Sequence, residues 1–284
     1  MKWSVRFIFT LLGVGFIILT FRCDNKYYFK YWLSPINRGV IEYNSLRPQL
    51  ETKEDICGPK SPYEEYYNAD YFKWQIQHQM FQAAHSNPTR GGLIKPEYTV
   101  LEIGCSAGAV LNRIQCAQKI CVEINTNARE YAAKTYNIMT FRCIAELPDN
   151  SIHYAYSVSV LEHVEAPIIL LRQLYSKMRS DSMLEIQVKN EGRQSASNYL
   201  KQQKWSHKKL DLNNHLYTWT ELLLGNMIQA AGFKIIRIQS NIAAYPPNYQ
   251  ELQSKLQAQE WVEVIQEEGK RQGVETLIAF AKKV

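Results

Sequence analysis

The sequence lacks several patterns that would point to common kinds of site. Its six cysteines form no C-x-x-C pair and do not cluster with histidines, so no metal site is expected. It has no Gly-Lys-Ser/Thr phosphate loop, no internal repeat and no low-complexity tract. A formal net charge of +6 over 284 residues is mild, so nucleic acid is not an expected partner. With 46% hydrophobic residues, the chain can bury a sizeable core.

A long apolar run, residues 7–21, stands near the N-terminus and carries no charge. With its immediate neighbours it approaches the roughly 17–20 residues that a helix needs to cross a membrane. We therefore expect a signal-anchor transmembrane segment within residues 1–25. A cleaved signal peptide is the alternative, although the run is followed by bulky residues rather than by a small-residue cleavage site. The positive charges after the run slightly favour a single-pass membrane protein whose catalytic domain faces the cytoplasm.

The cysteines are expected to be packed or free thiols. Cys105 lies in a glycine-containing turn, and Cys121 lies in an expected buried strand. Cysteines that stay as unpaired thiols suit a reducing compartment.

From residue 99 onward, short β-branched runs alternate with stretches whose apolar residues have helical spacing. This alternation predicts an α/β fold with a parallel sheet and helices on both faces. Further on, a helix that ends at Gly232 and two more strands are expected. The expected strands are residues 99–103, 119–124, 138–142, 153–160, 183–189, 234–239 and 275–283.

The stretch after the first strand carries the chemistry. Gly104 and Gly108 let the backbone approach a ligand at the carboxyl end of a strand, where the next helix offers its N-terminal amides. A dinucleotide site would also want glycine where Ser106 stands. Glu102 would repel phosphates but suits a ligand with a positive charge, and Glu123 ends the second strand where an acid can accept from both hydroxyls of a ribose. This combination describes S-adenosylmethionine better than a nicotinamide dinucleotide.

The motifs in residues 98–111, 121–125 and 143–167 resemble those of class I S-adenosylmethionine-dependent methyltransferases of the type-11 kind. The resemblance implies a Rossmann-like, seven-stranded, mostly parallel sheet with helices on both faces and an antiparallel last strand. It implies a methyltransferase domain over residues 96–284, preceded by a helical cap and linker over residues 26–95. The implied activity is methyl transfer to a small-molecule, lipid or saccharide acceptor.

The resemblance also assigns roles to individual residues. Around the methionine part of the cofactor it places Glu102, Gly104, Cys105, Ser106 and Gly108; at the ribose, Glu123; at the adenine, Ile124, Ala145 and Glu146; at the methyl-transfer end, Ser157 and Val158. Three positions depart from the family pattern. Ser106 replaces a glycine, Ile144 stands where many relatives carry the acid that binds the adenine amine, and His153 replaces an acid near the start of a strand.

Two histidines are candidates for the catalytic base. Methyl transfer needs a base only if the acceptor loses a proton. His163 begins the segment after the fourth strand, and His215 follows a polar connection that could form a lid. Packing or capping is the alternative for His163, and an exposed loop position is the alternative for His215. A nicotinamide-dependent oxidoreductase and a non-catalytic binding module stay open as other functions.

Overall fold

A computed structural model describes residues 6–10, 16–20, 57, 67–85, 87, 89–190 and 215–284. The chain divides into two compact units, Met1–Thr52 and Lys53–Val284. The expected polar lid over residues 191–214 lies outside the described residues.

In the first unit, the described parts of the apolar run do not form the predicted helix. Its described parts are two strands, β1 (Arg6–Thr10) and β2 (Phe16–Thr20), paired antiparallel with Arg6 opposite Thr20. Isoleucine, phenylalanine and threonine dominate these strands, and such side chains favour extended backbone as well as apolar surroundings. Within the described ranges, no helix combines the length and the apolar character needed to span a membrane. The prediction of a transmembrane helix is therefore wrong for these two segments.

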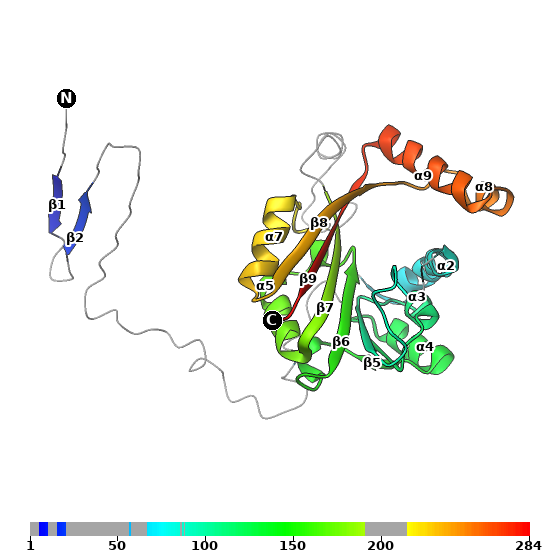
Figure 1. The fold of residues 1–284 in the computed structure, drawn as a ribbon, viewed down its shortest axis with the longest axis horizontal. Coiled ribbons are helices and arrows are strands. Elements are labelled where there is room, and N and C mark those ends of the chain that lie inside the picture. The colour runs from blue at the N-terminus through cyan, green and yellow to red at the C-terminus, as the bar shows by residue number, and fades with distance from the viewer. Residues whose placement is uncertain are drawn as a thin grey trace. The chain divides into compact units, whose positions relative to one another are not determined.

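The second unit is built on the predicted seven-stranded sheet (Figure 1). The strand order is β5-β4-β3-β6-β7-β9-β8. Neighbouring strands from β5 to β7 are parallel, and β9 runs antiparallel to both β7 and β8. The bounds are β3 Thr99–Ile103, β4 Gln118–Val122, β5 Met139–Phe141, β6 Ile152–Val158, β7 Met178–Lys189, β8 Lys234–Ile242 and β9 Glu275–Lys282. The Rossmann-like fold with an antiparallel last strand is confirmed.

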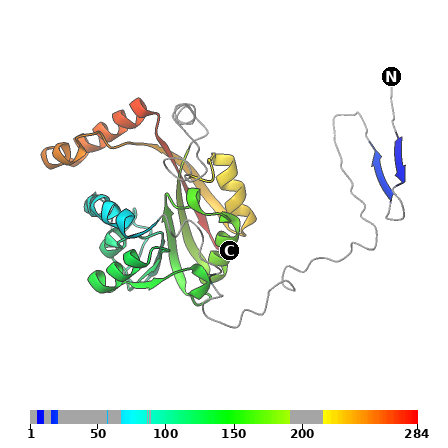
Figure 2. The ribbon, with the colours of Figure 1, turned by 180° about the vertical axis from the view of Figure 1, so that it is seen from behind.

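Helices cover both faces of the sheet, as the alternation predicts (Figures 1 and 2). One core cluster joins the sheet to α5 and α7, and the other joins it to α3 and α4. Along β3, Val100 belongs to one cluster and Leu101 to the other, because successive strand residues point to opposite faces. The bounds are α2 Ala69–His85, α3 Ala109–Arg113, α4 Thr126–Tyr136, α5 Pro167–Lys177 and α7 Glu221–Ala230, with short turns η3 Ile144–Glu146 and η4 Leu161–His163.

Two further helices, α8 (Tyr249–Lys255) and α9 (Ala258–Gln272), lie in the connection between β8 and β9. Both views show them as an arm that leaves the sheet at the ends of these strands (Figures 1 and 2). Helix α9 begins with a capping box between Gln257 and Glu260 and ends at Gly273 in the left-handed conformation.

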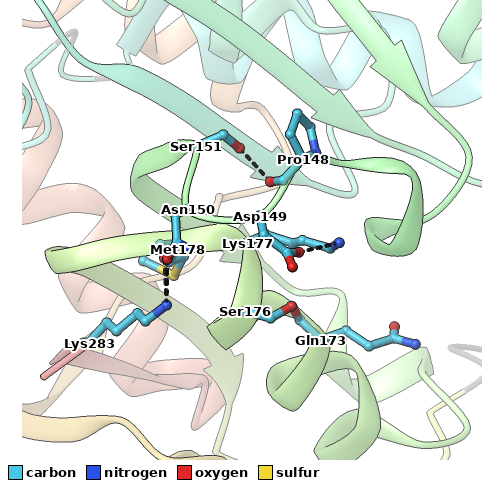
Figure 3. Close-up of polar contacts among 9 residues, drawn as sticks. All are labelled: Pro148, Asp149, Asn150, Ser151, Gln173, Ser176, Lys177, Met178 and Lys283. Atoms are coloured by element: carbon cyan, nitrogen blue, oxygen red, sulfur yellow. Dashed lines mark hydrogen bonds and ion pairs between the residues drawn. The ribbon is translucent and has the colours of Figure 1, made fainter.

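The amino end of β6 is closed by polar contacts (Figure 3). Lys177 Nζ lies 2.7 Å from Asp149 Oδ1, and Lys283 Nζ donates to the Met178 carbonyl at 2.8 Å. These contacts tie the loop before β6 to α5 and to the C-terminus. The opposite, carboxyl ends of β3, β4 and β6 carry the candidate site.

Candidate functional site

The turn after β3 needs glycine for two reasons. Gly104 and Gly108 have φ angles of 71° and 76°, in the left-handed region, and Ser106 between them has φ 47°. A Cβ on Gly104 would lie 2.3 Å from Val160 Cγ2, and one on Gly108 would lie 2.9 Å from Ile138 Cδ1. The turn is therefore packed closely against the segment that follows β6 and against Ile138, which lies just before β5. Ser106 keeps a glycine-like backbone, so this departure from the family pattern changes the side chain and not the path of the chain.

The acid at the end of β4 meets this turn. Glu123 Oε2 accepts from the Ser106 amide and Oε1 accepts from the Asn125 amide, both at 2.9 Å. Arg129 Nη1 donates to the carbonyls of Glu123 and Ile124 at 2.6 and 2.8 Å and so fixes the loop that bears them. Burial raises the pKa of Glu123. The structure thus brings together the predicted ribose acid and the predicted turn.

The Glu123 carboxylate has acceptor capacity left for a sugar diol. An ionised carboxylate offers about four acceptor positions, and the Ser106 and Asn125 amides occupy two of them. The residues present therefore fit the ribose of the expected cofactor.

Glu102 lies on β3, two residues before Gly104. Its Oε2 makes no hydrogen bond within the described part of the chain, and neither does Ser157 Oγ. The Tyr156 hydroxyl lies near enough to the Glu102 carboxyl to act on its pKa, so these two groups face each other. All three residues are buried. Burial raises the pKa of Glu102 to about 7. Buried polar atoms without partners are rare in folded proteins, so Ser157 Oγ and Glu102 Oε2 are the atoms here that a ligand or water could satisfy.

Arg90 and Glu185 form an ion pair near Glu102 that the sequence analysis did not predict. Arg90 Nε donates to Glu185 Oε2 at 2.7 Å, Arg90 Nη2 contacts Oε1, and the Tyr154 hydroxyl and Gln187 Nε2 also donate to this carboxylate, each at 2.5 Å. The Arg90 guanidinium lies 4.1 Å above the Tyr156 ring. Burial opposes ionisation of Glu185, but the hydrogen bonds and charge of Arg90, together with the hydrogen bonds from Tyr154 and Gln187, outweigh it and hold the pKa of this carboxyl below its usual value. The available signal was an acid, Glu185, amid the apolar residues of the expected strand 183–189.

Helix α2 covers the turn. Gln75 Oε1 accepts from the Ser106 hydroxyl at 2.6 Å, and Gln79 Nε2 donates to the Cys105 carbonyl at 3.0 Å. Phe72 packs against Tyr131 of α4, with ring centroids 5.6 Å apart. The segment before the methyltransferase motifs therefore contributes directly to the site.

The cysteine prediction is wrong for four of the five described cysteines. Cys105 is bonded to Cys121 and Cys57 to Cys143, each pair with Cα atoms 5.7 Å apart, and Cys116 is the free thiol of the described residues. Parallel pairing of β3 and β4 places Cys121 beside the turn that holds Cys105, and a separation of 16 residues conceals this in the sequence. 

One set of three potential metal ligands occurs in the described ranges: Cys57, Cys143 and Glu146. Since the two sulfurs bond each other, neither is free to bind an ion.

The loop expected at the adenine has one residue in the core and two that are at least partly exposed. Ile144 is buried in the core, whereas Ala145 is half-buried and Glu146 is exposed, with its Oε2 accepting from the Arg142 amide at 3.0 Å. At the methyl-transfer end, Val158 is exposed. 

The departure from the family pattern at His153 has a structural reason. His153 Nδ1 accepts from the Thr99 amide at 3.1 Å, and its ring stacks on Tyr98 with centroids 5.1 Å apart. These contacts fix the amino end of β3, away from the turn.

The two candidate bases lie next to each other. The rings of His163 and His215 have centroids 4.9 Å apart, and the Tyr67 ring lies 6.1 Å from that of His163. The Leu216 amide donates to the Glu162 carbonyl at 2.7 Å, which attaches the second segment to η4. Residues 52 positions apart in the sequence therefore form one cluster beside the turn.

Comparisons with known proteins agree with this geometry. Residues 72–238 match a family model described as a methyltransferase domain. A methyltransferase from Archaeoglobus fulgidus, titled as S-adenosylmethionine-dependent, superposes with a TM-score of 0.50 at 20% identity, over 75% of this chain and 99% of that chain. One from Thermotoga maritima gives 0.51 at 17% identity, over 78% and 98%. Among curated proteins, none matches. At such identities the structural likeness supports the fold.

Proposed function

The chain belongs to the methyltransferase-domain family, and from this premise we propose how it binds S-adenosylmethionine and transfers the methyl group. It is a class I methyltransferase. Its acceptor is a small molecule, lipid or saccharide.

One observation carries the cofactor proposal: the Glu123 carboxylate lies against the Ser106 amide at the carboxyl end of the sheet. Glu123 binds the ribose hydroxyls, and Ile124 packs on the adenine. Glu102 lies near the turn with an unpaired oxygen that suits the positive charge of the methionine part. Ser157 Oγ, also unpaired, lies at the end of β6 where the methyl group is expected.

S-adenosylmethionine, when bound, supplies an electrophilic methyl group: an acceptor lone pair bonds to its carbon while the carbon–sulfur bond breaks and leaves its electron pair on sulfur. The protein contributes mainly alignment of the two reactants. His163 and His215 are placed to receive a proton from an acceptor that must lose one, such as a hydroxyl.

Calorimetric titration with S-adenosylmethionine tests the cofactor. We expect low-micromolar binding to the wild type, no binding to Glu123→Ala, and unchanged binding to Glu130→Ala, which removes an exposed acid of the neighbouring helix α4. Titration with a nicotinamide dinucleotide is the parallel measurement for the oxidoreductase alternative. Absence of heat with S-adenosylmethionine, or heat only with the dinucleotide, would contradict the proposal.

The membrane tether and its orientation belong to the same proposal. The uncharged run at residues 7–21 supports attachment near a membrane-associated acceptor. The flanking charges favour a cytoplasmic domain, whereas structural disulfides persist mainly in oxidising compartments. We give the disulfides more weight, because the charge difference is small. Alkaline extraction of membranes tests the tether. A maleimide mass-tag assay before and after reduction tests the disulfides in cells. Tagging of Cys57, Cys105, Cys121 and Cys143 without reduction, in addition to Cys116, would restore the cytoplasmic orientation.

A further inference from the structure

Two backbone amides hold the Glu123 carboxylate, and each belongs to a residue whose side chain bonds to α2 or to the residue that caps it. Ser106 donates its amide to Glu123 Oε2 at 2.9 Å and its hydroxyl to Gln75 Oε1 at 2.6 Å. Asn125 donates its amide to Glu123 Oε1 at 2.9 Å and its Nδ2 to the Asn68 carbonyl at 3.2 Å. Burial raises the pKa of Glu123, and the two amides act against this by stabilising the ionised form. The helix before the sheet is therefore connected to both donors of the expected ribose acid.

Ser106 adopts a backbone conformation that favours glycine. Its φ of 47° lies in the left-handed region, at a position where the family pattern has glycine. Its side chain is buried, so the hydroxyl needs a hydrogen-bond partner, and Gln75 supplies one. A glycine would fit this turn without the backbone cost, and it would still donate its amide to Glu123. The bond to Gln75 is therefore what the serine adds.

Helix α2 is fixed against the turn at a second point. Gln79 lies one helical turn after Gln75, on the same face, and its Nε2 donates to the Cys105 carbonyl at 3.0 Å. The start of the helix is also fixed, because Asn68 Oδ1 accepts from two amides of its first turn, at 3.0 and 3.1 Å. Gln75 is thus held between two anchored points of the helix, and its amide oxygen has a defined place over Ser106.

We propose that Gln75 is a positioning residue for the cofactor: through the Ser106 hydroxyl it fixes the amide that orients the Glu123 carboxylate toward the ribose. The inference rests on the proposed function and extends it, since it gives the helix before the methyltransferase motifs a part in cofactor affinity. The coupling is reciprocal, so a ligand that engages Glu123 also stabilises the docked helix α2. 

Calorimetric titration of the full chain with S-adenosylhomocysteine tests the proposal. Gln75→Met keeps the length of the side chain and removes the acceptor of the Ser106 hydroxyl. This variant should bind about tenfold more weakly than the wild type, which corresponds to the loss of one hydrogen bond. Lys73→Met is the matched control, because Lys73 is an exposed residue of the same helix, and its affinity should equal that of the wild type.

A second variant, Ser106→Gly, protects the test against misfolding. It keeps the amide that donates to Glu123 and suits the left-handed backbone, so relief of strain offsets the lost hydrogen bond. The melting temperature without ligand should stay within about 3 °C of the wild type, while the affinity falls about tenfold. The double variant Gln75→Met/Ser106→Gly should bind as Ser106→Gly does, because both changes remove the same bond.

The 2′-deoxy analogue of S-adenosylhomocysteine shows whether the effect acts at the ribose. It lacks one of the two hydroxyls that Glu123 is expected to accept. The affinity lost in Gln75→Met should therefore be about tenfold for S-adenosylhomocysteine but less than about threefold for the analogue. A general loosening of the site would weaken both ligands by the same factor.

Three results would overturn the inference while the proposed function stands: unchanged affinity in Ser106→Gly, losses that multiply in the double variant, or equal losses for the two ligands in Gln75→Met. Each of them requires that the wild type binds S-adenosylhomocysteine. A wild type that gives no binding heat would instead overturn the proposed function and this inference with it, so the two failures are distinguishable.

Discussion

Gly104→Ala is expected to destabilise the domain through two independent costs. The φ angle of 71° lies in the left-handed region, where an alanine costs about 1–2 kcal/mol. The new methyl group would also lie 2.3 Å from Val160 Cγ2, so the turn or Val160 must move, which adds about 1–3 kcal/mol. The free energy of unfolding should therefore fall by about 2–5 kcal/mol.

A double-mutant cycle separates these costs. Val160→Ala alone should cost about 1 kcal/mol, because the side chain is only half-buried. In the double variant Gly104→Ala/Val160→Ala the collision disappears and the backbone cost stays, so a favourable coupling of about 1–3 kcal/mol is expected. Gly91→Ala is the matched control: its φ is 72°, and nothing lies within 4 Å of the added carbon.

Urea unfolding of the five proteins, followed by tryptophan fluorescence, measures the cycle. Gly91→Ala should show the backbone cost alone. A coupling below about 0.5 kcal/mol, or equal losses for Gly91→Ala and Gly104→Ala, would refute the claim that Val160, in the segment that follows β6, packs on the turn after β3.

Three other outcomes follow from the same structure. Burial raises the pKa of Glu102 from 4.5 to about 7, so its contribution favours folding below pH 4.5 and is lost as the pH rises through 7. The free energy of unfolding of Glu102→Gln should therefore rise relative to that of the wild type by up to about 3 kcal/mol between pH 5 and pH 8. A difference between the two proteins that is the same at both pH values would contradict this. Arg90→Met leaves the buried Glu185 carboxylate without its ion-pair partner and should lower the free energy of unfolding in urea by about 3–5 kcal/mol. The double variant Arg90→Met/Glu185→Leu should recover most of this loss. A double variant as unstable as the single one argues against a buried charge pair. Asn125→Ala removes the side-chain acceptor for two amides of α4 and should lower the melting temperature through a loss of about 1 kcal/mol, while an unchanged melting temperature would mean that the cap is dispensable.

The sequence predicts the sheet well because its apolar residues recur with clear strand and helix spacing. Buried β-branched runs mark β3, β4, β6 and β7. Helix α7 ends at Ala230, close to the expected Gly232, although Ala231 is its C-cap residue. The predicted acid–turn pair, Glu123 with Ser106, is also found in contact, because the carboxyl ends of adjacent parallel strands meet at one edge.

What the sequence does not reveal depends on contacts between distant segments. The bond between Cys57 and Cys143 joins residues 86 positions apart, and the Arg90–Glu185 pair joins residues 95 apart. No local pattern encodes either. The helices α8 and α9 were missed for a different reason: they interrupt the expected step from β8 to β9.

The apolar run at residues 7–21 shows the opposite problem. Its composition fits a membrane helix and a β-hairpin equally well, because the same side chains are apolar and favour extended backbone. Hydrophobicity alone could not separate the two.

A crystal structure grown with S-adenosylhomocysteine tests the central claim most directly. The account predicts both ribose hydroxyls within hydrogen-bond distance of the Glu123 carboxylate and the sulfur on the side of Ser157 and the His163–His215 pair. A ligand bound elsewhere, with Glu123 still engaged only by the Ser106 and Asn125 amides, would contradict it.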